Sequence, residues 1–208
     1  MARGRPGPVD GGAMTTAAGV TPAWFEPEPR RFRQVLGHFC TGVTVITGCD
    51  EDGPAGFACQ AFAAVSLDPP LVLFCPSRSS ATWPRIEGAG HFCVNVLAAD
   101  QRGLARIFGV SAAAGAGKFA GVGWSPSTAG APVLDGALTW MACAVEAVHE
   151  AGDHVAVLGR VTELGPCRTG SPLLFYRGRY AETAAHPAEG PPEVADTLLS
   201  WPRHADWI

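Results

Sequence analysis

The sequence predicts a mainly β protein, an antiparallel β-barrel with a few flanking helices. About six short runs rich in β-branched and aromatic residues are separated by turn sequences, as expected of strands. The helical patterns fall at irregular places between these runs, whereas a doubly wound parallel sheet would alternate a helix with every strand. The chain has 208 residues, of which 47% are hydrophobic and only 16% charged, so it can bury a sizeable core.

The first elements expected along the chain are a helix and a hairpin. A helical spacing of apolar residues predicts an amphipathic helix over 29–40. Two β-rich runs, 43–47 and 56–65, flank the turn sequence 50–54 and predict a β-hairpin. The apolar positions of the helix are Phe32, Val35, Leu36 and Phe39.

Short helices and further strands are expected in the rest of the chain. The double proline after Asp68 favours extended backbone before a strand at 71–75. Serines in the polar loop 76–80 can cap a short helix over 81–87, and we expect the first amides of that helix to bind an anion. The other expected elements are a strand at 92–97, a helix at 100–108, a Gly/Ala/Ser-rich loop at 111–132, long strands at 138–148 and 154–164, and a strand at 173–176.

Both ends are expected to lie outside the folded domain, which we assign to residues 29–183. Residues 1–28 are interpreted as a disordered tail, because they lack the apolar core and cleavage site of a secretory signal. Residues 184–208 are interpreted as a Pro/Gly/Ala-rich linker followed by a C-terminal tail. No apolar stretch approaches the roughly 18 residues of a membrane-spanning helix, so no membrane partner is expected.

The cysteines indicate the cellular compartment, and the net charge indicates which partners to expect. The 7 cysteines are odd in number and form no C-x-x-C pair, which favours buried free thiols in the reducing cytoplasm over a disulfide framework or a zinc site. The net charge is −4 and the arginines form no long run, so nucleic acid is not an expected partner.

Several familiar motifs are absent. The segment 115–121 half resembles a phosphate-binding glycine loop, but Phe119 stands after Lys118 where a P-loop needs Ser or Thr. The chain has no G-x-S-x-G and no H-E-x-x-H, and its histidines lack metal-ligand spacing. Hydrolase chemistry and a metal site are therefore not expected.

The segment 56–80 is the strongest candidate for a binding site. It combines small residues around Gln60 with a Ser/Arg loop before a predicted helix. Small side chains let a planar ligand approach the backbone, and a Ser/Arg loop suits a phosphate. A purely structural interpretation, in which the alanines pack the sheet and the serines cap the helix, is favoured by spacing alone.

Six segments, in order, resemble the flavin reductase family with the FMN-binding split-barrel fold. The resemblance covers residues 32–180, and although GDH alone is a weak signal, six segments in the same order are a specific one. It implies a homodimer of Greek-key split barrels that reduces FMN or FAD with NADH, or with NADPH as an alternative donor. It also implies a separate flavin-dependent oxygenase that receives the diffusing reduced flavin, in steroid or aromatic degradation. The segments are FRQVLGHFCTGVTVITG, GFACQAFAAVSLDPPLVLFCPSRSSATW, HFCVNVLAADQ, KFAGVGW, GDH and PLLFYRGRY.

The resemblance also implies roles for individual residues. Residues 58–64 would lie along the flavin ring, and Ser66 with the loop 77–80 would hold the ribityl chain and the phosphate. His154, with Tyr176 and Arg177, would shape the nicotinamide side. Phe108, Lys118 and Phe119 would reach the flavin or its phosphate across the dimer. The implied binding set is Ala58, Cys59, Gln60, Ala61, Ser66, Ser77, Arg78, Ser79, Ser80, Phe108, Lys118, Phe119, His154, Tyr176 and Arg177, with His154 as the catalytic residue that positions the nicotinamide.

In this interpretation the hydride passes from the nicotinamide C4 to the flavin N5, which requires neither a nucleophile nor a metal. Many family members carry Thr, Asn and Ser where this chain has Ala58, Gln60, Ala61 and Ala64, so the backbone should matter more for flavin contact here. Two alternatives stay open: a reductase that serves an unrelated hydroxylase, and a non-catalytic flavin- or haem-binding split-barrel module.

Overall fold

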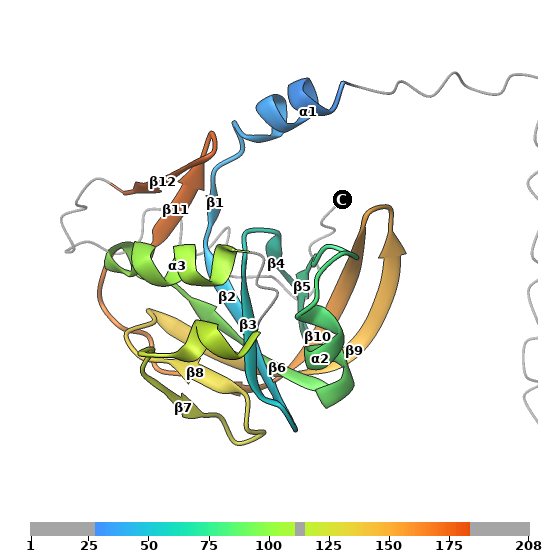
Figure 1. Ribbon diagram of the computed structural model, residues 1–208, viewed down its shortest axis with the longest axis vertical. Coiled ribbons are helices and arrows are strands. Elements are labelled where there is room, and N and C mark those ends of the chain that lie inside the picture. Colours follow the sequence, from blue (N-terminus) through green and yellow to red (C-terminus); the bar gives the residue numbers. More distant parts are fainter. Residues whose placement is uncertain (1–27, 111–114, 184–208) are drawn as a thin grey trace, which may run out of the picture.

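The computed structural model describes residues 28–110 and 115–183, and it is built around one curved antiparallel sheet (Figure 1). The sheet has seven strands in the order β3-β2-β6-β9-β10-β5-β4. The prediction of a mainly β, antiparallel protein is confirmed. The strands are β2 (Thr44–Asp50), β3 (Gly53–Cys59), β4 (Phe62–Leu67), β5 (Pro70–Phe74), β6 (His91–Val96), β9 (Thr139–Ala151) and β10 (His154–Leu164).

Smaller elements surround this sheet. One three-stranded sheet has the order β1-β11-β12, and β7 pairs with β8. Figure 1 shows helix α1 at the end of the molecule beyond β1, β11 and β12. The bounds are α1 (Pro29–Leu36), β1 (Thr41–Gly42), α2 (Trp83–Ala89), the 3-10 helix η1 (Ala99–Gln101), α3 (Arg102–Gly109), the 3-10 helix η2 (Gly115–Phe119), β7 (Trp124–Pro126), β8 (Pro132–Leu134), β11 (Leu173–Tyr176) and β12 (Arg179–Glu182).

The two edges of the main sheet meet at Gln60 and Ala61. Strands β3 and β4 are the opposite edges of the sheet, yet they follow one another in the chain with only these two residues between them. The chain from Cys59 to Phe62 can span at most about 11 Å, so the sheet must curl until its edges converge here. The expected single strand over 56–65 is therefore wrong, because β3 pairs with β2 whereas β4 pairs with β5.

The core is divided into two apolar clusters. In the first, Phe74 contacts Phe92 and Trp83 edge to face, at ring-centroid distances of 4.9 and 5.5 Å. In the second, Phe119 packs in the same way against Phe108 and Trp124, at 5.1 and 6.0 Å. The second cluster fixes α3 and η2 to the barrel, which places Lys118 of η2 beside β3.

Helix α1 differs from its prediction in length and in burial. It ends at Leu36 rather than at residue 40, and the amide of Gly37 donates to the carbonyl of Arg33. None of its residues is buried, although the amphipathic pattern predicts a covered apolar face. Nothing in the part of the chain that the structure describes covers the exposed side chains, which are Phe32, Val35, Leu36 and Phe39.

Other boundaries shift by a few residues, and some elements were not expected. The short helix expected over 81–87 spans Trp83–Ala89, and the helix expected over 100–108 begins with a 3-10 turn and ends at Gly109. The loop expected over 111–132 contains η2 and β7, while β1, β8 and β12 had no predicted counterpart. The expectations for residues 1–27 and 184–208 lie outside the described residues.

The structure shows which cysteines are buried and whether any described helix could cross a membrane. All seven cysteines are described and none is in a disulfide. Cys59, Cys93 and Cys143 are buried and Cys49 and Cys75 are half-buried, so the expectation of buried thiols is wrong for Cys40 and Cys167. Cys40 and Cys167 are exposed because they lie in connections outside the main sheet. None of the helices described has the length and hydropathy needed to cross a membrane.

Candidate functional site

A cavity of about 370 Å³ opens where the two edges of the main sheet meet. Its walls come from the end of β3, the junction to β4, the loop after β5, the end of α3, η2 and the start of β10. We call it the junction pocket. Of the residues predicted to bind the flavin, it brings together Ala58, Cys59, Gln60, Ala61, Ser77, Ser79, Ser80, Phe108, Lys118 and His154.

Five predicted residues lie outside the junction pocket. Phe119 is buried in the second core cluster, and Ser66 lies on β4 beyond the pocket walls. The side chain of Arg78 turns away to an ion pair with Glu150. Tyr176 contacts His38 edge to face at 6.3 Å, and the amide of Arg177 donates to the carbonyl of Gly37.

The loop between β5 and α2 is held in place by the hairpin of β9 and β10. The amide of Arg78 donates to the carbonyl of Asp153 at 3.0 Å, and the amide of Val155 donates to the carbonyl of Pro76 at 3.0 Å. Ser77 also forms an isolated antiparallel bridge with His154. The loop that carries the serines and the turn that carries the histidine therefore form one rigid wall of the pocket.

The serines of this loop divide into two roles. The hydroxyls of Ser77 and Ser79 lie 2.8 Å apart, and both residues line the pocket. The hydroxyl of Ser80 instead accepts hydrogen bonds from the amides of Thr82 and Trp83, at 3.3 and 3.1 Å. The expectation that the first amides of the helix bind an anion is therefore wrong for these two, because Ser80 already caps them.

Lys118 places a buried ammonium group inside the junction pocket. The residue is 7% exposed, and its Nζ donates to the carbonyl oxygens of Phe108 and Gly56, at 3.2 and 3.4 Å. None of the ion pairs within residues 28–110 and 115–183 involves Lys118. Burial lowers the pKa of Lys118, because desolvation disfavours the charged ammonium. An ammonium group has three N–H donors, so one is left for a ligand in this pocket.

The route across a dimer that the resemblance implies for Lys118 stays a prediction. Within one chain, η2 carries this residue into the junction pocket. The reason is the packing of Phe119 in the second core cluster, which turns the preceding lysine toward Gly56 on β3. Phe108 lines the same pocket from α3 of the same chain.

His154 is oriented by the residue before it. Its Nδ1 lies 2.7 Å from a carboxylate oxygen of Asp153. Because a carboxylate only accepts hydrogen bonds, Nδ1 carries the proton, and Nε2 is the ring nitrogen left to meet a ligand. The same hydrogen bond holds the pKa of the Asp153 carboxyl below its usual range.

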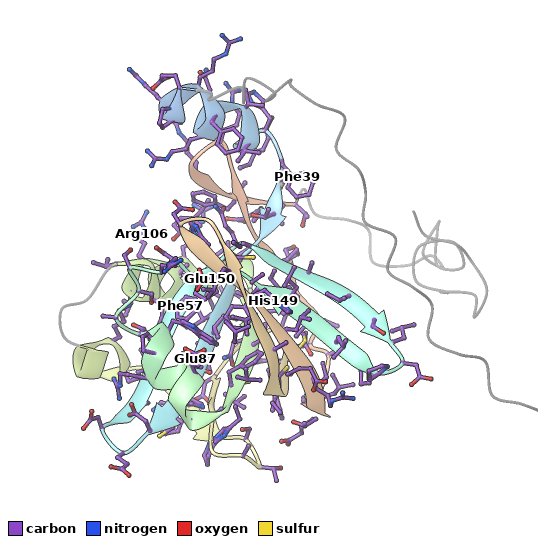
Figure 2. All side chains as sticks on the ribbon, turned by 90° about the vertical axis from the view of Figure 1, so that its right-hand side faces the viewer. Phe39, Phe57, Glu87, Arg106, His149 and Glu150 are labelled. Carbon is purple, nitrogen blue, oxygen red and sulfur yellow. The ribbon has the colours of Figure 1, made fainter. Side chains whose placement is uncertain are left out.

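A second cavity, of about 690 Å³, adjoins the junction pocket and shares Gln60, Ala61 and Cys75 with it. Its other walls are the end of α1 and parts of β1, β4, β5 and β11. We call it the apolar groove, since apolar side chains such as Phe39 and Phe175 line it. Figure 2 shows Phe39 on the segment that leads from α1 into the barrel.

Two thiols line the junction pocket but are poor nucleophiles. Burial raises the pKa of Cys59 to about 11 and also raises the pKa of Cys75. Because the thiolate is the reactive form, both groups stay protonated near neutral pH and act as small apolar wall residues.

Sequence reasoning missed the acidic residues that organise the site. Glu150 and Asp153 lie at the tip of the β9–β10 hairpin and engage Arg78 and His154. The signal available in the sequence was the acidic turn around the GDH segment, together with an arginine in the serine loop that could pair with it. The pairing of β5 with β10 that brings them together is a long-range contact, which one sequence does not reveal.

Comparisons with known proteins agree with this architecture. The family model described as "Flavin reductase like domain" matches residues 36–184. The reductase subunit HsaB of a flavin-dependent monooxygenase from Rhodococcus jostii is 54% identical over 153 residues, which cover 74% of this chain and 77% of the relative.

Two solved structures share the fold. Nitrilotriacetate monooxygenase component B from Mycobacterium thermoresistibile has a TM-score of 0.72 and 48% identity, covering 82% of this chain and 96% of that one. The NADH:FAD oxidoreductase SgcE6 from Streptomyces globisporus, solved with NAD and FAD fragments, has a TM-score of 0.72 and 34% identity, covering 79% of this chain and 98% of that one. The chain belongs to the flavin reductase family of oxidoreductases and has its split-barrel fold.

Proposed function

We propose that this chain binds FMN or FAD in the junction pocket, reduces it with NADH, and releases the reduced flavin to a separate monooxygenase. NADPH is the alternative donor. The observation that carries the proposal is the buried ammonium of Lys118 in the same pocket as Ser77 and Ser79. A buried cation with no acidic partner is costly, so this pocket favours an anionic ligand such as the phosphate of a flavin.

The other walls of the pocket suit a planar ring. Ala58 and Ala61 leave the backbone accessible at the junction of β3 and β4, where a larger side chain would fill the space. Gln60 offers an amide that can both donate and accept hydrogen bonds at the ring edge. When bound, the flavin accepts the hydride of NADH. The protein contributes orientation and electrostatic stabilisation.

In the proposed complex His154 positions the nicotinamide. Asp153 fixes the tautomer of the ring, so that Nε2 faces away from the carboxylate toward incoming ligands. Tyr176 and Arg177 lie beside the end of α1, outside the junction pocket that His154 lines. We propose that Tyr176 and Arg177 contact NADH at the outer rim of the site, where it would enter between the junction pocket and the apolar groove.

The protein is proposed to act as a homodimer. Phe39 and Val35 at the end of α1 are 77% and 62% exposed, and Leu67 on the edge strand β4 is 62% exposed. Exposed apolar side chains at the end of α1 favour an interaction surface there, and a two-fold dimer is the commonest solution. Sedimentation equilibrium of the wild type and of a Val35→Ser/Phe39→Ser variant tests this: we expect a dimer and a monomer, respectively, and a monomeric wild type would contradict the proposal.

The cellular setting is proposed to be the cytoplasm, in steroid or aromatic degradation. The free thiols support a reducing compartment. The partner oxygenase is tested by keeping reductase and oxygenase on opposite sides of a dialysis membrane that passes only small molecules. Product formation in the presence of NADH and flavin supports diffusion of the reduced flavin, whereas activity only on direct mixing would contradict it.

Flavin binding without NADH consumption would instead favour the alternative function, a non-catalytic flavin-binding module. A reductase that works equally well with an unrelated hydroxylase would keep the reaction and change only the assigned partner. Equilibrium titration with FMN, FAD and haem, followed by addition of NADH, separates these outcomes.

A further inference from the structure

Arg78 lies between two residues that face the junction pocket, yet its own side chain is engaged elsewhere. Its neighbours Ser77 and Ser79 line the pocket, while its guanidinium forms an ion pair with Glu150. Figure 2 shows Glu150 on the β9–β10 hairpin. The side chains of Arg78 and Glu150 are 56% and 72% exposed, so the pair is in contact with water.

The backbone of this region is held by hydrogen bonds that do not involve the arginine side chain. The amide of Arg78 donates to the carbonyl of Asp153, and Ser77 bridges to His154. The ion pair is therefore not needed to dock the loop on the hairpin. The long arginine side chain can exchange partners while its Cα remains in place, because exposed ion pairs contribute little to stability.

A carboxylate and a phosphate compete for the same guanidinium. Both present two oxygens that match the planar fork of N–H donors, and the phosphate carries more charge. Lys118 differs from Arg78, because it is buried inside the pocket and has no carboxylate partner among the described residues. Lys118 therefore has no carboxylate to displace among the described residues, whereas the guanidinium of Arg78 is already occupied by Glu150.

We propose that Glu150 is an internal competitor for Arg78 that weakens the binding of phosphorylated flavins. In the flavin-free protein its carboxylate occupies the guanidinium, and the flavin phosphate must displace it. Each release of flavin is in turn assisted by the return of Glu150 to Arg78. This inference rests on the proposed function, since it concerns the affinity of the same pocket, and it makes Glu150 a positioning residue that acts through Arg78.

The same hairpin offers a matched control. Glu146 pairs with Arg160 across β9 and β10, with side chains 38% and 43% exposed, and neither residue lines the junction pocket. A Glu146→Gln substitution therefore removes a similar cross-strand ion pair without touching the proposed competition.

The test is the dissociation constant of FMN and of riboflavin, which lacks the phosphate, for purified full-length variants. Glu150→Gln should bind FMN about two- to five-fold more tightly, because the FMN phosphate no longer has to displace a carboxylate from Arg78. This range corresponds to the small stability of an exposed ion pair. It should bind riboflavin as the wild type does. Glu146→Gln should leave both constants unchanged. In an Arg78→Ala background the Glu150→Gln substitution should have no further effect on FMN.

Two results would overturn the inference. If Glu150→Gln weakens FMN and riboflavin alike, Glu150 supports the loop and does not compete with phosphate. If Glu150→Gln leaves FMN binding unchanged while the wild type binds FMN normally, the ion pair has no influence on the pocket. Failure of the proposed function would look different, because the wild type itself would then bind no flavin.

Discussion

The ammonium of Lys118 donates to the main-chain carbonyl of Phe108 across 3.2 Å, inside a pocket that offers it no carboxylate among the described residues. The contact joins η2 to the end of α3, two elements held together by the second core cluster. The fold thus maintains a buried positive charge at the proposed phosphate end of the flavin site.

Replacing Lys118 with Met should weaken FMN binding by about 10- to 100-fold, because hydrogen bonds to a charged group contribute about 1.5–3 kcal/mol. Riboflavin should lose much less affinity, since it has no phosphate for the ammonium to meet. Fluorescence titration of both ligands measures the effect. Equal losses for the two ligands would place Lys118 at the ring and not at the phosphate.

The same substitution should change how the stability of the flavin-free protein depends on pH. The pKa of Lys118 is lowered in the folded state, so between that value and the unfolded value of about 10.4 the unfolded chain binds more protons. Stability of the wild type should therefore gain an increment as pH rises through this range. Urea unfolding at a series of pH values should show that Lys118→Met lacks this increment, and identical slopes would contradict the buried charge.

Replacing His154 with Ala should raise the KM for NADH by about two- to ten-fold, the range expected from losing one ordinary hydrogen bond. The dissociation constant for FMN should stay near the wild-type value. Steady-state kinetics with a separate FMN titration checks both quantities. A loss of FMN affinity with unchanged KM would move His154 from the nicotinamide side to the flavin side.

Asn95 is fully buried and links three parts of the fold. Its side-chain amide donates to the carbonyl of Val45 and the hydroxyl of Thr47, and its oxygen accepts from the amide of Leu134. Asn95→Leu should cost about 2–4 kcal/mol of unfolding free energy, because several buried polar groups lose partners. Thr162→Val, which removes one half-buried hydrogen bond, should cost less. Similar losses for the two variants in urea unfolding would contradict this account of the network.

Gly159 lies on β10 where a side chain would overlap the ring of Phe92. Phe92 is fully buried, so Gly159→Ala should destabilise the protein by about 1–3 kcal/mol through overpacking. Gly88, in α2, has open space around it, and Gly88→Ala should stabilise by about 0.5–1 kcal/mol. Thermal unfolding should therefore shift in opposite directions for the two alanine variants.

The strand pattern and the serine loop could be predicted from the sequence because both depend on local chemistry. Alternating β-branched residues and turn sequences identify β2, β5, β6, β9 and β10 within a few residues. The break at Gln60 could not be predicted, since GFACQAFAAV contains no residue that interrupts a strand. Only the pairing of β3 and β4 with different neighbours separates them.

Two features of the site depend on contacts that are distant in the sequence. The amphipathic pattern of α1 predicts a covered apolar face but does not say what covers it, and the described part of the chain leaves Phe39 exposed. Lys118 follows a glycine-rich stretch with no local structural signal, and the packing of Phe119 decides where the ammonium points. The ion pair of Arg78 with Glu150 likewise requires the pairing of β5 with β10.

The most direct test of the central claim is NADH oxidation by the purified protein, followed by the absorbance of the reduced nicotinamide, with FMN, with FAD and with no added flavin. We expect rapid oxidation that depends on added flavin and that falls in the Lys118→Met variant at low flavin concentration. Flavin binding without NADH oxidation in any of the three mixtures would contradict it.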